Sequence, residues 1–205
     1  MLKIFTVGPM EANCYILYNP DKREGLIIDP GAEGSHLIKF IKQEKISINY
    51  IVNTHGHPDH IGANRKIKEH TNAPILIHQY DAPMLAKSGS VLSLIFFPLE
   101  SSSPAADTFI KDGDLIECAG MKLKVLHTPG HTPGGISLLI DDSIFTGDTL
   151  FSGSIGRSDL PGGSQEVLLN SIKKILSLDE NLIIYPGHGP ATTVGQELHS
   201  NPFIT

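Results

Sequence analysis

Short runs of apolar residues, rich in Ile and Val, recur along the chain, and turn-forming residues separate them. Runs of about four to eight such residues between turn signals are typical of β-strands. The pattern predicts strands at Lys3–Val7, Asn13–Tyr18, Gly25–Asp29, Ile48–Asn53, Pro74–His78, Leu115–Cys118, Lys122–His127, Ile136–Ile140, Ser143–Thr146 and Leu182–Tyr185.

Other stretches repeat apolar residues three and four positions apart, which is the spacing of one helix face. This pattern predicts helices at Ser35–Lys45, Ala63–His70, Gln79–Ala86 and Gln165–Ser177. We expect Ser164 to cap the N-terminus of the last helix. Because strands and helices occur in both halves of the chain, we predict an α/β fold in which helices cover sheets.

The sequence shows no repeat of fixed period and no linker, so we expect residues 1–205 to form one domain. A chain of 205 residues is long enough to bury a full hydrophobic core. The segment Ser88–Ala106 gives mixed signals, and we interpret it as a long loop or lid.

Charge and composition exclude several classes of partner. The net charge of −6 disfavours nucleic-acid binding. The longest apolar stretch, Val91–Leu99, contains Ser and Pro and is too short to span a bilayer, so no membrane partner is expected. The N-terminus does not resemble a signal peptide, and Cys14 and Cys118 form no CxxC pair. We therefore expect a cytoplasmic protein with reduced thiols.

Half of the ten histidines lie in three short segments that contain Gly and Pro. Four predicted strands end at tight turns, and each turn carries side chains that bind metals. If these strands share sheet edges, the turns converge on one rim, where the sites of layered α/β folds tend to lie. The candidate ligands are His55, His57, Asp59, His60, His131, Asp148 and His188.

Imidazole and carboxylate ligands without a thiolate suit Zn²⁺ best, and also Fe or Mn. Seven ligands are too many for one tetrahedral ion, whereas two ions with a bridging carboxylate would each keep a position for water. One ion would bind His55, His57 and His131; the second would bind Asp59, His60 and His188; and Asp148 would bridge them. The other histidines are assigned ordinary roles: His36, His70 and His199 at the surface, His78 at a strand end, and His127 facing the core.

Five segments resemble the metallo-β-lactamase superfamily, and within it the hydroxyacylglutathione hydrolases (glyoxalase II) and their short bacterial relatives. These segments are IIDPGAE at 27–33, THGHPDH at 54–60, TPGHTPG at 128–134, FTGDTLF at 145–151 and PGHGP at 186–190. The resemblance implies a four-layer αββα sandwich, in which two mixed β-sheets carry helices on their outer faces. It also implies a dinuclear metal site at one edge, with the ligands assigned above.

The resemblance further implies a metal-dependent hydrolase of small-molecule thioesters or acyl compounds, such as hydroxyacylglutathione, that acts through a metal-bound hydroxide. We expect His57, Asp59 and Asp148 to be catalytic, with Asp59 orienting the attacking water.

Two residues near these segments have an open role. Asp29 is expected either to accept a ring N–H from a ligand histidine or to serve as a turn residue. Arg157 follows Asp148 in the loop FSGSIGRSDLPGG, and we expect it either to bind a substrate carboxylate or to form an ion pair with Asp159 or with a carboxylate behind the site.

Two departures from the family pattern limit the range of candidate substrates. Metallo-β-lactamases typically place a Cys in the second metal site, whereas neither cysteine here lies in a ligand segment, which argues against β-lactam hydrolysis. Hydroxyacylglutathione hydrolases typically carry a further C-terminal helical region that helps to bind glutathione. Only 17 residues follow His188 in this sequence, so we expect that region to be absent.

Three other functions compete with thioester hydrolysis. Persulfide dioxygenases resemble the same fold and use one iron, which here would bind His55, His131 and Asp148. RNA-processing nucleases share the His-x-His-x-Asp-His segment, but the acidic charge and the lack of a basic arm argue against them. An electron-transfer role would normally need a flavin domain, for which this sequence has no room.

Overall fold

The apolar runs form two six-stranded mixed sheets in the computed structural model, which describes residues 1–87 and 103–204. The first sheet has the order β1-β2-β3-β4-β5-β6. Its strands β3, β4, β5 and β6 are parallel to one another, and β1 and β2 are added in antiparallel pairing. The strands are β1 (Leu2–Val7), β2 (Ala12–Asn19), β3 (Glu24–Ile28), β4 (Ser47–Val52), β5 (Ile75–His78) and β6 (Thr108–Ile110).

The second sheet has the order β14-β13-β10-β9-β8-β7, with one parallel pair, β10 and β13. A separate two-stranded hairpin, β11 (Leu150–Phe151) with β12 (Ser154–Ile155), follows β10. The strands of the second sheet are β7 (Leu115–Cys118), β8 (Met121–His127), β9 (Ile136–Ile140), β10 (Ser143–Gly147), β13 (Ile183–Pro186) and β14 (Thr192–Thr193).

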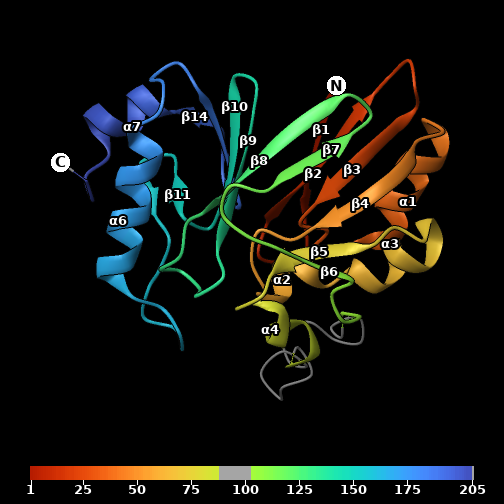
Figure 1. Ribbon diagram of the computed structural model, residues 1–205, viewed down its shortest axis with the longest axis horizontal. Coiled ribbons are helices and arrows are strands. Elements are labelled where there is room, and N and C mark those ends of the chain that lie inside the picture. The colour runs from red at the N-terminus through yellow and green to blue at the C-terminus, as the bar shows by residue number, and fades with distance from the viewer. Residues whose placement is uncertain (88–102, 205) are drawn as a thin grey trace.

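Helices cover the outer face of each sheet, with α1 and α3 beside the first and α6 and α7 beside the second (Figure 1). The expected cap of the long helix is confirmed, because the Ser164 side chain accepts a hydrogen bond from Val167 N. The helices are α1 (Gly34–Gln43), α2 (Pro58–Ile61), α3 (Asn64–Thr71), α4 (Ala82–Lys87), α6 (Gln165–Leu176) and α7 (Val194–Ser200).

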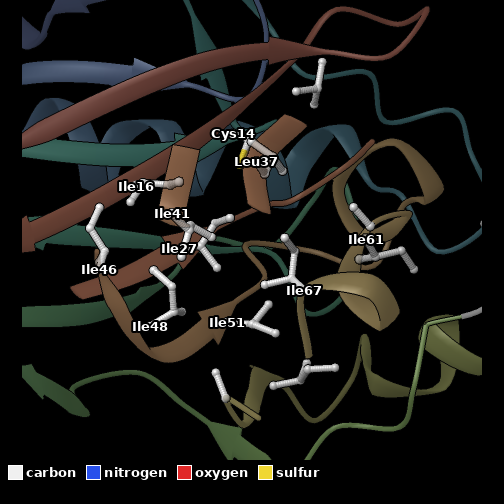
Figure 2. Packing of buried hydrophobic residues seen from close by; sticks show 14 of the residues in the cluster. Cys14, Ile16, Ile27, Leu37, Ile41, Ile46, Ile48, Ile51, Ile61 and Ile67 are labelled. Carbon is white, nitrogen blue, oxygen red and sulfur yellow. The ribbon is translucent and has the colours of Figure 1, made fainter. Parts of the chain in front are cut away.

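The alternation of side chains along β2 shows how the layers are held together. Cys14 and Ile16 point toward α1 and α3 in one hydrophobic cluster, which Figure 2 shows, while Tyr15 and Leu17 pack between the two sheets. A third cluster, which includes Ile144 of β10 and several residues of α6, fills the space behind the second sheet. Three apolar clusters thus separate four layers, and the predicted αββα sandwich is confirmed.

The sequence pattern missed the shortest elements. Strands β6, β11, β12 and β14 have two or three residues each, which is too few positions for an alternation to be visible. Helix α7 was also missed, and α4 begins at Ala82 rather than at Gln79. The predicted loop Ser88–Ala106 lies outside the described residues except for 103–106.

The expectation that His127 faces the core is wrong. Its side chain is half-buried, and its ring stacks on that of His78 with the centroids 4.2 Å apart. Each residue is the last of its strand, β8 and β5 respectively, so the two rings meet beyond the apolar layer between the sheets.

The strand directions bring five carboxyl ends to one side of the molecule. In the first sheet β3 and β4 are parallel. In the second, β8 and β10 both pair antiparallel with β9, and β13 is parallel to β10, so all three run the same way. The segments that follow these strands therefore lie close to one another. Within the described residues, no helix is long and apolar enough to cross a membrane.

Candidate metal centre

The segment after β4 changes backbone conformation in the middle of the His-x-His-x-Asp-His motif. His57 is extended, with φ −71 and ψ 148, and Pro58 begins the short helix α2. Asp59 and His60 therefore lie in a helical turn, whereas His55 and His57 precede it. Because of this change, the four side chains reach two different places, as the spacing predicted.

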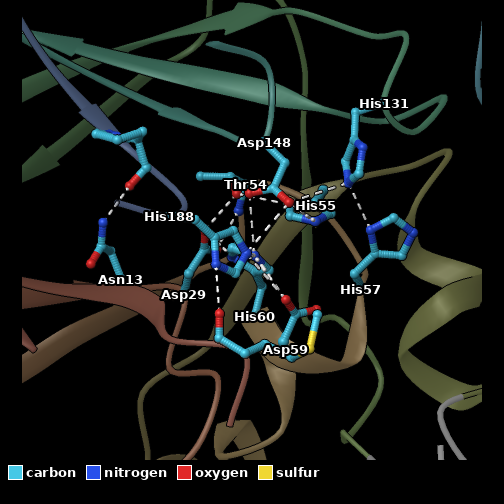
Figure 3. Close-up of polar contacts among 12 residues, drawn as sticks. Asn13, Asp29, Thr54, His55, His57, Asp59, His60, His131, Asp148 and His188 are labelled. Carbon is cyan, nitrogen blue, oxygen red and sulfur yellow. Dashed lines mark hydrogen bonds and ion pairs between the residues drawn. The ribbon is translucent and has the colours of Figure 1, made fainter. Parts of the chain in front are cut away.

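The structure brings all seven predicted ligands together (Figure 3). Six of them form two groups of three, in each of which the ligand atoms lie within 4.8 Å of one another, and Asp148 is the seventh. The imidazole group consists of His55, His57 and His131, and the carboxylate group consists of Asp59, His60 and His188.

Asp148 lies between these two groups. Its Oδ2 is 3.4 Å from His131 Nε2 in the imidazole group and 3.6 Å from His188 Nε2 in the carboxylate group. Its Oδ1 is 3.4 Å from His60 Nε2. A single carboxylate at the end of β10 is thus placed between both groups, where a bridging ligand would stand.

Four of the five candidate histidine ligands make a hydrogen-bond contact through Nδ1 with another part of the protein. In each of the four, Nε2 is left facing the centre of the site. The oxygen partners of Nδ1 are Thr54 Oγ1 for His55 (3.1 Å), Asp29 Oδ2 for His60 (3.1 Å), Arg157 O for His131 (2.7 Å) and Met10 O for His188 (3.0 Å). Such contacts place the proton on Nδ1 and fix both the tautomer and the direction of the ring.

Asp29 contacts a candidate ligand directly. It follows β3 in a left-handed conformation, with φ 49, and its side chain is buried. The carboxylate accepts hydrogen bonds from Thr54 N (2.7 Å) and Thr54 Oγ1 (2.5 Å) as well as facing His60. Of its two expected roles, the structure thus contains the contact with a histidine.

The two groups differ in their electrostatics. Burial lowers the pKa of His57 to about 4 and the pKa of His55 well below its ordinary value. Burial acts in the same direction on His60, but the carboxylates of Asp148 and Asp59 outweigh it and raise the pKa of His60 to about 10. Burial therefore holds His55 and His57 in the neutral form, which is the form that binds metals, whereas the carboxylates around His60 favour its protonated form.

Two atoms at the centre indicate that a cation belongs there. Within the described part of the chain, His55 Nε2 and Asp148 Oδ1 are buried side-chain atoms without a hydrogen-bond partner. Buried polar atoms are rarely left unpaired, because the loss of hydration is costly. A donor set of imidazoles and carboxylates with unpaired inward-facing atoms fits a divalent metal ion.

Sequence reasoning missed two residues that hold the ligand loops. The buried Asn13 on β2 donates from Nδ2 to Pro186 O (3.0 Å) and Gly189 O (2.8 Å), on either side of His188. The buried Asp81 contacts the loops of His57 and His131. Asp81 lies inside the predicted helix Gln79–Ala86 rather than in a turn that ends a strand, and no sequence signal marked Asn13.

A cavity of about 460 Å³ opens beside the centre. Its floor contains members of both groups and Asp148, and its walls are largely apolar: Met10, Pro58, Phe151, Ile155 and Leu160. Arg157 also lines it, but the guanidinium is paired in two hydrogen bonds (2.9 and 2.8 Å) with Asp159. The backbone carbonyl of Arg157, rather than its side chain, touches the centre.

A family model and curated protein sequences that match this chain point to the same family. A family model described as "Metallo-beta-lactamase superfamily" matches residues 7–188. A probable metallo-hydrolase of Bacillus subtilis, YqgX, is 39% identical and covers 97% of this chain and 94% of its own length. The hydroxyacylglutathione hydrolase GloC of Haemophilus influenzae is 36% identical, with 99% and 97% covered.

Solved structures agree with these relatives. The BLEG-1 B3 metallo-β-lactamase superposes with a TM-score of 0.93 at 38% identity, covering both chains fully. TTHA1623, solved in a di-iron-bound form, has a TM-score of 0.87 at 34% identity, with 98% of this chain and 99% of that chain covered.

Proposed function

The chain belongs to the metallo-β-lactamase superfamily of metallo-hydrolases, and we propose that it hydrolyses thioesters or related acyl bonds with two divalent ions. One observation carries the proposal: two ligand groups of three residues each share Asp148 on the floor of a largely apolar cavity. The imidazole group would hold one ion, the carboxylate group would hold the second, and Asp148 would bridge them.

Two ions held in this way would lower the pKa of a water molecule toward neutrality and polarise the carbonyl of the substrate. Zinc is our first choice because the donors are imidazoles and carboxylates, and the di-iron form of TTHA1623 makes iron the second.

The protein contributes orientation and charge to this reaction. The Asp59 carboxylate lies at the cavity, 3.2 Å from His188 Nε2, where it can accept a hydrogen bond from the attacking water and direct that water at the carbonyl carbon. Burial raises the pKa of Asp59, but His60 and His188 outweigh it and hold the pKa below its usual range. This residue is therefore ionised at neutral pH and available as an acceptor.

The walls of the cavity suggest which part of the substrate lies there. Met10 comes from the β1–β2 turn, whereas Phe151 and Ile155 come from the hairpin, and together they offer an apolar surface beside the two ligand groups. Such walls suit the uncharged acyl portion of a thioester. Arg157 stands at the exposed rim, where it would meet a carboxylate on the thiol portion once Asp159 releases it.

A panel of thioesters with metal analysis tests the proposal. We expect the metal-loaded chain to hydrolyse S-lactoylglutathione or a simpler acyl thioester, and we expect a chelator to remove the activity and restored metal to return it. The panel includes a β-lactam, because BLEG-1 carries that description. A chain that cleaves the β-lactam and no thioester would overturn the proposed substrate class.

A persulfide dioxygenase with one iron is the alternative, because its three expected ligands also meet. Asp148 Oδ2 lies 3.4 Å from His131 Nε2 and 4.0 Å from His55 Nε2. Oxygen uptake with glutathione persulfide and one iron per chain would favour this function over hydrolysis.

A further inference from the structure

We propose that Asp81 is the positioning residue of the imidazole group: one buried carboxylate clamps the two loops whose histidines would hold a single ion. The proposal deepens the proposed function, because it rests on the two-ion assignment.

Asp81 stands between two segments that are far apart in the sequence. It follows β5 by three residues and directly precedes α4. Its Oδ2 accepts hydrogen bonds from Gly56 N (3.0 Å) and Thr132 Oγ1 (2.7 Å), and its Oδ1 accepts one from Gly134 N (2.6 Å). The carboxylate itself is fully buried.

The bonded donors lie directly beside the candidate ligands. Gly56 separates His55 from His57, and Thr132 follows His131. Nδ1 of His57 and Nε2 of His131 are 2.8 Å apart, so a small displacement of either loop changes the distance between ligand atoms. Because a metal ion needs its ligands at fixed distances, a clamp on both loops acts on the ion through the two histidines.

Close backbone contact shows that the loops are fitted to Asp81. A Cβ atom on Gly134 would stand 2.6 Å from both the backbone N and the Oδ1 of Asp81, which real contacts do not allow. A Cβ on Gly56 would stand 2.6 Å from Met84 Cβ and 3.0 Å from Asp81 O. Glycine at both places therefore lets the two loops approach the carboxylate closely enough for hydrogen bonds.

Asp81 contacts the loops of the imidazole group and, among the residues that the structure describes, makes no hydrogen bond to the loops of the carboxylate group. The ligands of the carboxylate group are held by different atoms, Asp29 Oδ2 for His60 and Met10 O for His188. A merely structural role for Asp81 would lower the stability of the fold without favouring either ion. A positioning role would weaken one ion selectively, which distinguishes the two.

Glu197 offers a matched control. It is likewise a fully buried carboxylate with three donors: Gly153 N (2.9 Å), Thr192 Oγ1 (2.6 Å) and Asn201 Nδ2 (2.7 Å). These donors join α7 to neighbouring segments and include no neighbour of a candidate ligand. Glu197→Gln therefore measures the cost of changing a buried three-bond carboxylate to an amide.

The experiment removes metal from the zinc-loaded full-length chain with increasing chelator and measures zinc per chain at each step. We expect Asp81→Asn to lose one equivalent at about 10- to 100-fold lower chelator strength than wild type and to keep the other unchanged. Glu197→Gln should match wild type for both equivalents, even where it lowers the melting temperature as much as Asp81→Asn does.

Two further comparisons identify the ion and guard against misfolding. In a His188→Ala background Asp81→Asn should weaken the binding of the remaining ion, and in a His57→Ala background it should cause no further loss of metal.

If Asp81→Asn does not fold, Thr132→Val removes one donor and should weaken binding of the same metal equivalent about 3- to 10-fold. Thr132→Ser keeps the hydroxyl and should match wild type.

The outcomes separate the two proposals. Equal weakening of both equivalents, or wild-type retention of both in Asp81→Asn and Thr132→Val, would overturn the role of Asp81 and leave the two-ion site intact. A wild-type chain that holds fewer than two equivalents would instead refute the two-ion assignment itself.

Discussion

The imidazole group and the carboxylate group stand side by side but are held in different ways. The imidazole group has no carboxylate of its own, burial keeps His55 and His57 neutral, and a clamp at Asp81 joins its two loops. The carboxylate group includes Asp59 and faces Asp29, and the N-terminal hairpin supports it through Met10 O and Asn13.

The difference indicates that metal binding by the imidazole group depends on the exact positions of its nitrogens. Metal binding by the carboxylate group depends more on the attraction between its carboxylates and the ion. Neutral imidazoles bind an ion well only when their nitrogens are held at the right distances. Carboxylates attract the ion over a longer range, so their site tolerates more displacement. Substitutions in the two groups should therefore have distinguishable effects.

The largest effect is expected where the two groups meet. Asp148→Ala removes the carboxylate between them, so both ions should be weakened and kcat/KM should fall by at least about 1,000-fold. Steady-state kinetics with metal analysis checks this. The exposed Asp142→Ala, on the same β-hairpin, is the control and should match wild type. Full activity of Asp148→Ala in metal-free form would refute the mechanism.

The next largest effect is the loss of one ion from either group, which distinguishes the two groups. His57→Ala should remove the ion of the imidazole group, and His188→Ala should remove that of the carboxylate group, each lowering kcat by about 100-fold or more. Native mass spectrometry should find one ion on each variant. If either variant retains two ions, its histidine does not belong to the group to which we assign it.

A smaller effect is expected from the support of the carboxylate group. Asn13→Ala removes the donor to Gly189 O and one of the two donors to the buried Pro186 O, which keeps Tyr15 OH, so the free energy of unfolding should fall by about 1 kcal/mol. The ion of the carboxylate group should weaken by about 10-fold, while the other ion is unchanged. Denaturant unfolding and metal competition measure the two effects. The exposed Asn181→Ala should change neither.

The smallest effect concerns the rim of the cavity. Arg157→Ala should raise KM about 3- to 10-fold for a thioester that carries a carboxylate and leave KM for an uncharged thioester unchanged. Asp159→Ala should free the guanidinium and lower KM for the charged substrate. If neither variant shifts KM, the Arg157–Asp159 pair does not contact the substrate. It would then only stabilise the loop, whose Arg157 carbonyl contacts His131.

Most of the layers and the candidate ligands could be predicted from the sequence because each is marked locally. The apolar strand before His131 and the turn at Thr128–Gly130 are visible in consecutive letters. The supports were not visible, because their partners are remote: Asn13 and Pro186 are separated by 173 positions, and Asp81 and Thr132 by 51. The contact made by Arg157 was also hidden, because a backbone carbonyl leaves no trace in the residue type.

The most direct test of the two-ion claim follows the rate of thioester hydrolysis while zinc is added back to the metal-free chain. We predict that the rate rises until two equivalents per chain are bound and then stays constant, because Asp148 must bridge both groups for full activity. A rate that is already maximal at one equivalent, or that does not depend on zinc, would contradict the account.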